Sequence, residues 1–456
     1  MTDLTKIREY VAANQDRYID LLKQACSIPS VSAEGSGFEE MTGWLEEKLH
    51  DLGATVTHLQ VGDSPEALLA EIKGSSSKRT LMIYDHYDVQ PVDPIDLWVS
   101  PPFEPTIRDA KLFARGAADN KGDLVARLCA LEAFKELVGE LPFDLKFFIE
   151  GEEESGSVNF ENICHTYAED LRSDDCVWEG GWFDHDGRPQ MYYGCKGLLY
   201  VELNLKRLSG DQHSSIAVYT PSAAWELLNA IASLKDADGR ITIEGFYDGI
   251  VQPTDKELEL IEAIPFNEEA MKQSLGIDSF IGGLAGSQLK KDMLYEPTAN
   301  IAGFHSGYGV PGASKTVLPA EASAKMDFRL VPDQNSEDIA KKLQMHFESH
   351  GFEDIEIKVL SGENPSRSSM DSALGRAVEG AGAEWFDKAM VVYPFMWATG
   401  PMHPIAKGIG IPITSPPGVG RPDSNLHAPN ENARIADYLD IIGFTVSYFE
   451  RYGLTD

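Results

Sequence analysis

Apolar and polar residues follow two different patterns along this chain, and the pattern changes near residue 198. Before that point, short runs that are apolar almost throughout alternate with segments of helical spacing. Strands of this kind are buried on both faces of a sheet, which predicts an α/β domain. The predicted strands are residues 67–72, 80–84 and 145–149, and the predicted helices are residues 4–28, 37–52 and 122–137.

Beyond residue 198 the predicted strands alternate apolar and polar residues, as in a sheet with one face in water. These strands and the helices between them predict a smaller α+β layer with helices on one face. The strands are residues 198–205, 322–330 and 355–360, and the helices are residues 222–234 and 336–350. After about residue 370 the first pattern returns, with helices at 371–386 and 433–452 and a strand at 389–393.

The return of the first pattern predicts that one domain is inserted into another. We expect the larger α/β domain to comprise residues 1–198 and 358–456, and the smaller α+β domain to comprise residues 199–357. The chain is long enough for two domains by the usual relation of length to domain number.

The acidic character of the chain argues against nucleic acids and anionic membranes as partners. Its formal net charge is −34, from 73 acidic and 39 basic residues, whereas nucleic acids and anionic membranes bind basic surfaces. No apolar run approaches the roughly 20 residues of a membrane span. The N-terminal sequence also lacks the charged-then-apolar pattern of a signal peptide. We therefore expect a cytoplasmic protein that binds neither nucleic acid nor membranes.

The acidic run EGEEESGS, residues 150–157, follows directly on an apolar run. Glu152, Glu153 and Glu154 therefore stand at the exit of a strand that belongs in a core. Like charges this close repel, and burying each of them is costly unless a partner neutralises it. A bound cation is one such partner, and a solvated acidic turn is the alternative that this segment alone leaves open.

Further candidate metal ligands lie at predicted strand ends or in loops. His86 and Asp88 follow a strand, and Asp88 is placed to accept a hydrogen bond from one ring nitrogen while the other binds a metal. Asp119 precedes a helix, where a simple helix cap is the alternative. Glu179 follows a short apolar stretch, and His427 lies in a loop rich in Pro, Asn and Gly.

Histidines and carboxylates without cysteine form a ligand set that suits a pair of divalent ions such as zinc, manganese or cobalt. The five cysteines form no CxxC pair, so the sequence predicts neither a thiolate zinc site nor a disulfide framework. Two metal ions that share a ligand form a hydrolytic site, in which one further carboxylate acts as general base.

Five motifs, in this order, resemble those of the cocatalytic-zinc peptidase family, which includes carnosine dipeptidase, carboxypeptidase G, aminoacylase, acetylornithine deacetylase and succinyl-diaminopimelate desuccinylase. The motifs are HYDVQPVD, LFARGAADNKGD, EGEEESGS, HSGYGVPGASKTVLPAEASAKMDFRLVP and PDSNLHAPNE. The resemblance implies a catalytic domain with a mixed central sheet flanked by helices. It also implies that the inserted α+β domain is a lid that mediates dimerisation.

The resemblance implies a metal-binding role for five of the candidates. One ion would be bound by His86 and Glu179, and the second by Glu154 and His427, with Asp119 bridging the two ions.

Other positions of the motifs would act beside the ligands. Asp88 matches the carboxylate that orients the histidine, and Glu153 matches the general base. Glu152 falls at a position that varies in the family, and we expect it at the surface.

The inserted domain also carries matches. His213 matches a histidine that reaches the partner subunit's active site and stabilises the oxyanion. Asn300 and Arg329 match residues that hold the substrate carboxylate, for which a guanidinium is suited by its bidentate geometry. Without the resemblance, His213 is a turn residue and Arg329 a strand-surface charge. The chain departs from the family at SSIAVYTPSA and at ATGPMHP, two segments that shape the family's substrate pocket, so the substrate stays open.

We therefore predict a hydrolase with two divalent metal ions per subunit, zinc above all, with manganese and cobalt as alternatives. It would act as a homodimer and cleave an amide bond next to a free carboxylate, in dipeptides or at C-terminal residues. A deacylase of N-acyl amino acids is the alternative enzyme, and a catalytically silent metal-binding relative is the alternative outside the enzymes. Glu179 is typical of the family's carboxypeptidases and acyl-amino-acid hydrolases, whereas the motifs as a whole resemble its dipeptidases.

Overall fold

The protein folds into two compact units in a computed structural model that describes residues 1–76 and 78–455. Unit 1 comprises Met1–Gly194, Arg367–Pro394 and the chain from Pro401 onward, and unit 2 comprises Cys195–Ser366 and Phe395–Gly400. Unit 2 contains all of the segment 199–357 and extends beyond it on both sides. Within the described part of the chain, no helix is both long enough and apolar enough to span a membrane.

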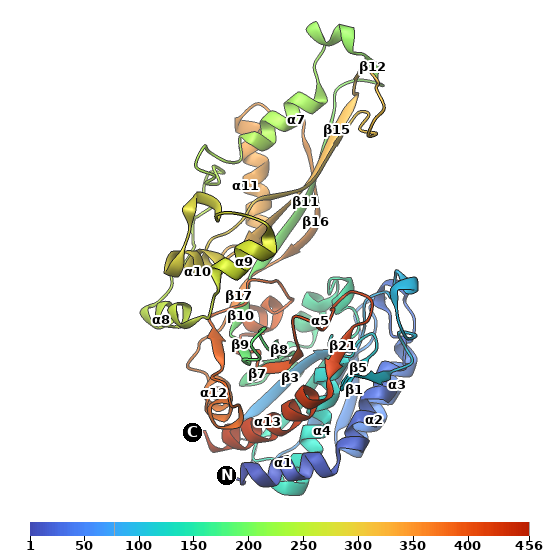
Figure 1. The fold of residues 1–456 in the computed structure, drawn as a ribbon, viewed down its shortest axis with the longest axis vertical. Helices are drawn as coiled ribbons and strands as arrows, with labels where there is room; N and C mark the ends of the chain where they lie inside the picture. Colours follow the sequence, from blue (N-terminus) through green and yellow to red (C-terminus); the bar gives the residue numbers. More distant parts are fainter. Residues whose placement is uncertain (77, 456) are drawn as a thin grey trace. The chain divides into compact units, whose positions relative to one another are not determined.

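The sheet of unit 1 is mixed and has the strand order β1-β2-β6-β3-β7-β19. Figure 1 labels three of its strands, β1, β3 and β7. Its strands are β1 (Thr55–Leu59), β2 (Ala67–Ile72), β3 (Thr80–His86), β6 (Asp144–Glu150), β7 (Asp175–Trp178) and β19 (Ile413–Thr414). The pairs β1–β2 and β2–β6 are antiparallel, whereas β6, β3, β7 and β19 run parallel. Every residue of β6 is buried, as expected for an apolar strand covered on both faces. The predicted α/β class with a mixed central sheet is confirmed.

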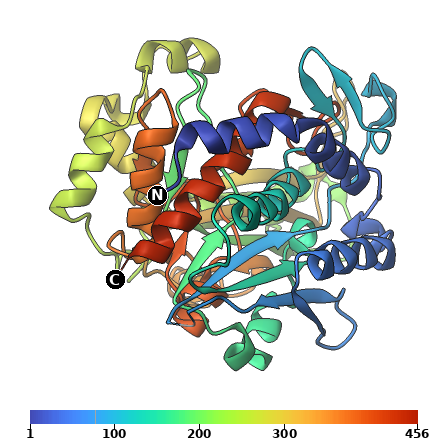
Figure 2. The ribbon, with the colours of Figure 1, turned by 90° about the horizontal axis from the view of Figure 1, so that it is seen from below.

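Helices cover one face of this sheet and enclose the main core of unit 1. α4 (Lys121–Leu137) packs on β3 and contacts both α2 (Gln15–Cys26) and α13 (Ile435–Leu454). Figure 2 shows α13, in red, beside α1 (Leu4–Ala13), in blue, so segments from the two ends of the sequence share this core. α12 (Ala373–Trp385) packs along α13 as well.

Aromatic rings fill the opposite face of the sheet. Phe160 of α5 (Phe160–Thr166) lies 5.4 Å from Tyr84 and 5.5 Å from Phe148, measured between ring centroids. Trp178 stacks on Tyr84 at 3.7 Å. These contacts make the strand ends rigid at the point where the polar residues of the chain gather.

The predicted helix over 4–28 is wrong in its extent, because the structure divides it into α1 and α2 at Asn14. Asn14 has φ −107° and ψ 7°, outside the helical range. Its side-chain amide donates to the carbonyl of Tyr10 at 2.9 Å. Asparagine competes in this way for backbone hydrogen bonds, so the helical spacing of apolar residues continues across a break in the backbone.

The sheet of unit 2 is antiparallel, with the order β13-β15-β11-β16. The strands are β13 (Asn300–Ser306), β15 (Glu321–Leu330), β11 (Gly197–Lys206) and β16 (Glu356–Glu363). Alternate residues of β11 are buried against α7 (Ala223–Ala232) and α11 (Ser336–Ser349), which share one core (Figure 1). The prediction of helices on one face of an alternating sheet is confirmed for this unit.

Some elements of unit 2 have no counterpart in the sequence prediction. They are β13, α8 (Asp255–Ala263), α9 (Glu268–Leu275) and α10 (Gly286–Tyr295). β13 is an edge strand that is exposed along nearly all of its length and contains Gly303. None of the described residues of α9 is buried. The exposed residues of β13 show no alternation of apolar and polar positions that would predict a strand.

Candidate metal centre

The predicted ligands of unit 1 gather at one edge of its sheet. β6, β3 and β7 are neighbouring parallel strands, so their carboxyl ends meet at this edge. His86 is the last residue of β3, and Glu179 follows β7 directly. Glu153 and Glu154 lie in the short turn η3 (Glu153–Ser155) after β6.

Two loops bring the remaining ligands to the same place. Asp119 stands immediately before α4, and its peptide bond to Asn120 is cis. His427 lies between β20 (Pro417–Gly420) and β21 (Asn432–Arg434), in the Pro- and Asn-rich loop that the sequence singled out.

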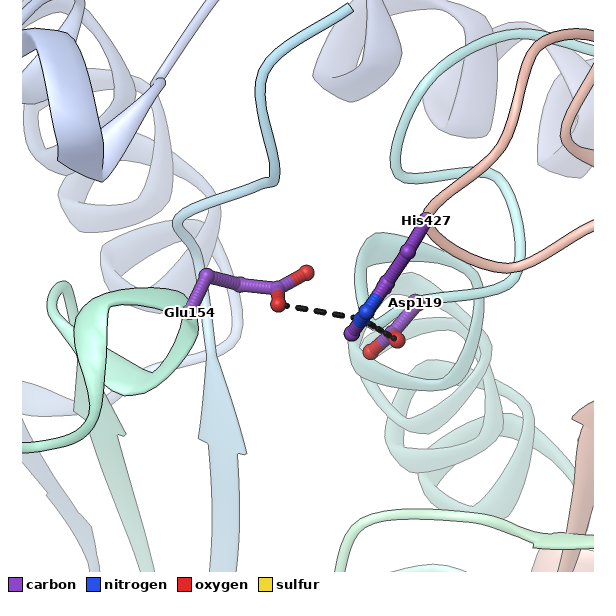
Figure 3. Close-up of side chains that lie close together, drawn as sticks. All are labelled: Asp119, Glu154 and His427. Carbon is purple, nitrogen blue, oxygen red and sulfur yellow. Dashed lines mark hydrogen bonds and ion pairs between the residues drawn. The ribbon is translucent and has the colours of Figure 1, made fainter. Parts of the chain in front are cut away.

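Asp119, Glu154 and His427 form a compact cluster (Figure 3). Nε2 of His427 lies 3.1 Å from Oδ2 of Asp119 and 3.1 Å from Oε2 of Glu154. Their potential ligand atoms all lie within 4.8 Å of one another. Figure 3 shows both carboxylates directed at the imidazole from opposite elements, the turn after β6 and the start of α4.

The second oxygen of Asp119 faces the other histidine. Oδ1 of Asp119 lies 3.2 Å from Nε2 of His86, whose side chain is 1% exposed. Asp119 therefore stands between two imidazoles with one oxygen toward each. A carboxylate in this position is suited to bridge two cations.

Asp88 connects the buried histidine to the acidic turn. Nδ1 of His86 lies 3.1 Å from the backbone carbonyl oxygen of Asp88 and 3.4 Å from Oδ1 of its carboxylate. The same carboxylate accepts hydrogen bonds from the backbone N–H groups of Glu153 at 3.2 Å and Glu154 at 3.0 Å. Asp88 thus holds the ring of His86 through its backbone carbonyl, and the backbone of both glutamates through its carboxylate.

The carboxylates of the turn and of Glu179 are crowded by like charges. Burial raises the pKa of Glu153 well above its ordinary value, and the charges of Glu154 and Asp119 raise it further against the opposing effect of His86. The pKa of Glu179 is likewise raised well above its usual range by burial and by the charge of Glu153. Burial also raises the pKa of Glu154.

The surrounding negative charge also raises the pKa of a histidine. Hydrogen bonds to Asp119 and Glu154 raise the pKa of His427 to about 10. Burial opposes ionisation of Asp119, but hydrogen bonds from His427 and His86 lower its pKa below the usual range. Such a site holds more negative charge than its own side chains can neutralise.

Buried oxygen atoms test whether these residues fit a metal ion. Among residues 1–76 and 78–455, Oε1 of Glu154 and Oε1 of Glu179 are buried without a hydrogen-bond partner. An orphaned buried carboxylate oxygen is costly, and a divalent cation is the partner that oxygen and imidazole ligands share. The donor set therefore fits divalent metal ions.

The prediction that Glu152 lies at the surface is wrong. Its side chain is buried, and it accepts hydrogen bonds from the backbone N–H of Asn159 at 2.7 Å and from Nδ2 of Asn159 at 3.0 Å. Glu152 therefore closes the acidic turn onto the start of α5. A polar partner seven residues away leaves no periodic signal in the sequence.

Arg127 is a buried residue of this region that the sequence prediction missed. Its guanidinium on α4 donates to the carboxylate of Asp85 and to the backbone carbonyl of Glu179. Asp85 and His86 continue β3 beyond residue 84, where the predicted strand ended. The available signal was an arginine inside an otherwise apolar helix segment, since a buried arginine requires a partner.

The predicted substrate residues lie in unit 2. Asn300 pairs with Asp327 across β13 and β15 and donates to its carboxylate at 2.8 Å. Arg329 stands on the same strand as Asp327 and donates to Oγ1 of Thr399 at 2.6 Å, within the segment ATGPMHP. His213 is exposed in β12 (Gln212–His213), with Nδ1 2.9 Å from Oγ of Ser215.

Comparison with known proteins identifies a family whose model matches most of the chain. A model of the family described as "Peptidase family M20/M25/M40" matches residues 82–451. Human Beta-Ala-His dipeptidase is 28% identical, over 98% of this chain and 92% of its own length. The Cys-Gly metallodipeptidase of Schizosaccharomyces pombe is 30% identical, over 75% of each chain.

Solved structures show the same architecture. An M20 family metallo-carboxypeptidase from Sulfolobus solfataricus superposes with a TM-score of 0.89 and 38% identity, covering 96% of this chain and 99% of its own. Human carnosine dipeptidase 1 superposes with a TM-score of 0.77 and 26% identity, covering 99% and 100%.

Proposed function

This chain belongs to peptidase family M20/M25/M40 and is a metallopeptidase, and from this premise we propose that it hydrolyses the peptide bond next to a free carboxylate. Dipeptides are the proposed substrates. The observation that carries the proposal is Asp119, whose two oxygens face two different histidines.

We propose two divalent metal ions per subunit, with zinc preferred and manganese or cobalt as alternatives. His86 and Glu179 would hold one ion, Glu154 and His427 the other, and Asp119 both. When bound, such ions polarise the substrate carbonyl and lower the pKa of an attacking water.

Glu153 is the proposed general base. Its backbone is held by Asp88, and burial and neighbouring negative charges raise the pKa of its carboxyl group. A carboxylate whose pKa lies above its usual range accepts a proton near neutral pH and can release it again. Glu153 would take the proton of the attacking water and deliver it to the leaving amine nitrogen.

Unit 2 supplies the proposed substrate contacts. The guanidinium of Arg329 and the amide of Asn300 would bind the substrate carboxylate, and His213 would stabilise the oxyanion in a second copy of the chain. Removal of one oxyanion donor typically costs about 3–4 kcal/mol of transition-state stabilisation. We propose residues 199–357 as the lid and dimerisation domain, and residues 1–198 and 358–456 as the catalytic domain of a cytoplasmic homodimer.

A carboxypeptidase is the second candidate. It is favoured by Glu179, which is typical of carboxypeptidases in the resembling family, and by the 38% identity to the metallo-carboxypeptidase of Sulfolobus solfataricus. The N-acyl-amino-acid deacylase is chemically close to it, because both cleave an amide bond next to a free carboxylate and neither requires a free amine in the substrate.

A panel of three substrates separates these functions. A dipeptidase cleaves the free dipeptide and leaves its N-acetyl form and its C-terminal amide intact. A carboxypeptidase or deacylase also cleaves the N-acetyl form. Cleavage of the C-terminal amide at an undiminished rate would contradict recognition of a free carboxylate, and full activity after chelator treatment would contradict the metal site.

A further inference from the structure

Glu431 is a buried carboxylate for which the proposed reaction has no use. It lies just before β21, in the same loop as His427, and its side chain is fully buried. Burial of a carboxylate is costly unless its oxygens accept hydrogen bonds, so its partners indicate what it does.

Both oxygens of Glu431 accept hydrogen bonds from the loop that carries Asp119. Oε1 accepts from the backbone N–H groups of Ala118 at 2.9 Å and Asp119 at 3.0 Å. Oε2 accepts from the backbone N–H of Gly116 at 3.0 Å and from Nη1 of Arg115 at 2.7 Å. This single side chain therefore shapes the backbone that leads into Asp119.

The ion pair with Arg115 does not by itself account for the burial of Glu431, because it involves only one of the two carboxylate oxygens. The other oxygen binds the N–H of Asp119 itself, whose carboxylate lies 3.1 Å from His427. Glu431 and His427 are four residues apart in one loop. Glu431 is thus joined to one candidate ligand by a hydrogen bond and to the other by a short length of chain.

We propose that Glu431 is a positioning residue that holds Asp119 and His427 at the spacing required by the metal ion they share. The inference rests on the proposed dinuclear function and names the residue that sets the affinity of one of its two metal sites. Partners behind metal ligands commonly contribute a factor of about 10–100 in metal affinity.

The test is the isosteric variant Glu431→Gln. It keeps the size of the side chain but turns one acceptor oxygen into an amide donor that faces backbone N–H groups. We expect zinc affinity at one of the two sites to fall by about 10–100-fold, measured by competition of the zinc-loaded protein with a chelator of known affinity. Excess zinc should restore hydrolysis in Glu431→Gln and should not restore it in Glu153→Gln.

Asp144→Asn is the matched control. Asp144 is also a buried carboxylate. It accepts a hydrogen bond from the backbone N–H of Gly74 at 2.9 Å and forms an ion pair with Lys73 at 3.0 Å. It lies at the first residue of β6, the end opposite the acidic turn. This variant should lose stability and keep both zinc affinities.

These measurements distinguish a failure of the positioning role of Glu431 from a failure of the proposed dinuclear function. Wild-type protein that binds fewer than two zinc ions contradicts the dinuclear function. Two ions bound to wild type, with unchanged affinities in folded Glu431→Gln, overturn the positioning role.

Amide hydrogen exchange of the wild-type protein needs no variant and applies even if Glu431→Gln fails to fold. Slow exchange at Ala118 and Asp119 supports the role, and exchange as fast as in an open loop overturns it.

Discussion

At the scale of single residues, the site is organised by carboxylates that each serve several partners. Asp119 faces His86 and His427, and Asp88 holds His86 together with the backbone of two glutamates. The side chains of the candidate site are therefore held in place by contacts within the protein, which do not require a substrate. This arrangement separates the proposed metal ligands from the residue proposed to move a proton.

Glu153→Gln should keep the metal ions and lose turnover. A positioned general base contributes about 10²–10⁴ in rate, and the amide cannot accept the proton. Metal content and kcat are measured on the same preparation. The neighbouring variant Glu152→Gln is the control, because Glu152 bonds to Asn159 and not to the site. Equal turnover in the two variants would remove Glu153 from its proposed role.

At the scale of elements, α4 ties the site to the sheet. Its residue Arg127 joins the end of β3, through Asp85, to the segment that leaves β7, through the carbonyl of Glu179. At the start of the helix, Lys121 donates to the carbonyls of Ala25 and Ile28 at 3.0 and 2.6 Å. Such buried cations fix how α4 sits against β3 and α2.

Arg127 and Asp85 form a buried ion pair. Removing only Arg127 should lower the free energy of unfolding more than replacing both residues. Arg127→Met leaves a buried carboxylate without its cation, which typically costs about 3–5 kcal/mol. Adding Asp85→Asn should recover part of that loss. The free energies of unfolding of the two single variants and the double variant form the cycle, and simple additivity would show that the two residues act independently.

Lys196, near the start of β11, should make stability depend on pH. Burial lowers the pKa of this 3%-exposed lysine from 10.5 to about 8. Between these values the unfolded chain binds more protons than the folded one, so stability rises with pH. Relative to Lys196→Met, wild type should gain on the order of 3 kcal/mol between pH 7 and 11. A difference in unfolding free energy that stays constant over this range would contradict the shifted pKa.

The elements found from the sequence are those that bury an apolar face. The strands 67–72, 80–84 and 145–149 were predicted because they are apolar almost throughout, and the motifs placed Glu154 after the strand 145–149 and Asp119 before a helix. β13 was missed because exposed residues carry no period. Contacts between distant residues, such as Glu431 with Asp119, were missed because spacing along the chain does not reveal them.

At the scale of the whole molecule, the proposed reaction requires residues from both units. Unit 1 holds the proposed metal ligands, and unit 2 holds the proposed substrate residues Arg329, Asn300 and His213. The net charge of −34 keeps copies of the chain apart at long range, so a stable dimer would depend on specific contacts. The rate of hydrolysis should therefore depend on dimer formation as well as on the residues of the metal site.

Hybrid dimers test whether His213 acts on a second copy of the chain. His213→Ala and Glu153→Gln should each be nearly inactive. A hybrid of the two, co-expressed with different tags, contains one site free of both defects and should recover activity. The control hybrid pairs Glu153→Gln with Glu154→Gln, where every site keeps one defect. A first hybrid as inactive as this control would place His213 in its own subunit's site.

Asp119 has a consequence for how this enzyme can diversify. Both of its oxygens and its N–H are engaged, with His86, His427 and Glu431. A substitution at any of these partners disturbs the others, so the metal centre can change only through several simultaneous substitutions. The segment ATGPMHP instead contains Thr399, which accepts a hydrogen bond from Arg329 within unit 2. New substrate preferences should therefore arise there, one substitution at a time, around a hydrolytic centre that stays constant.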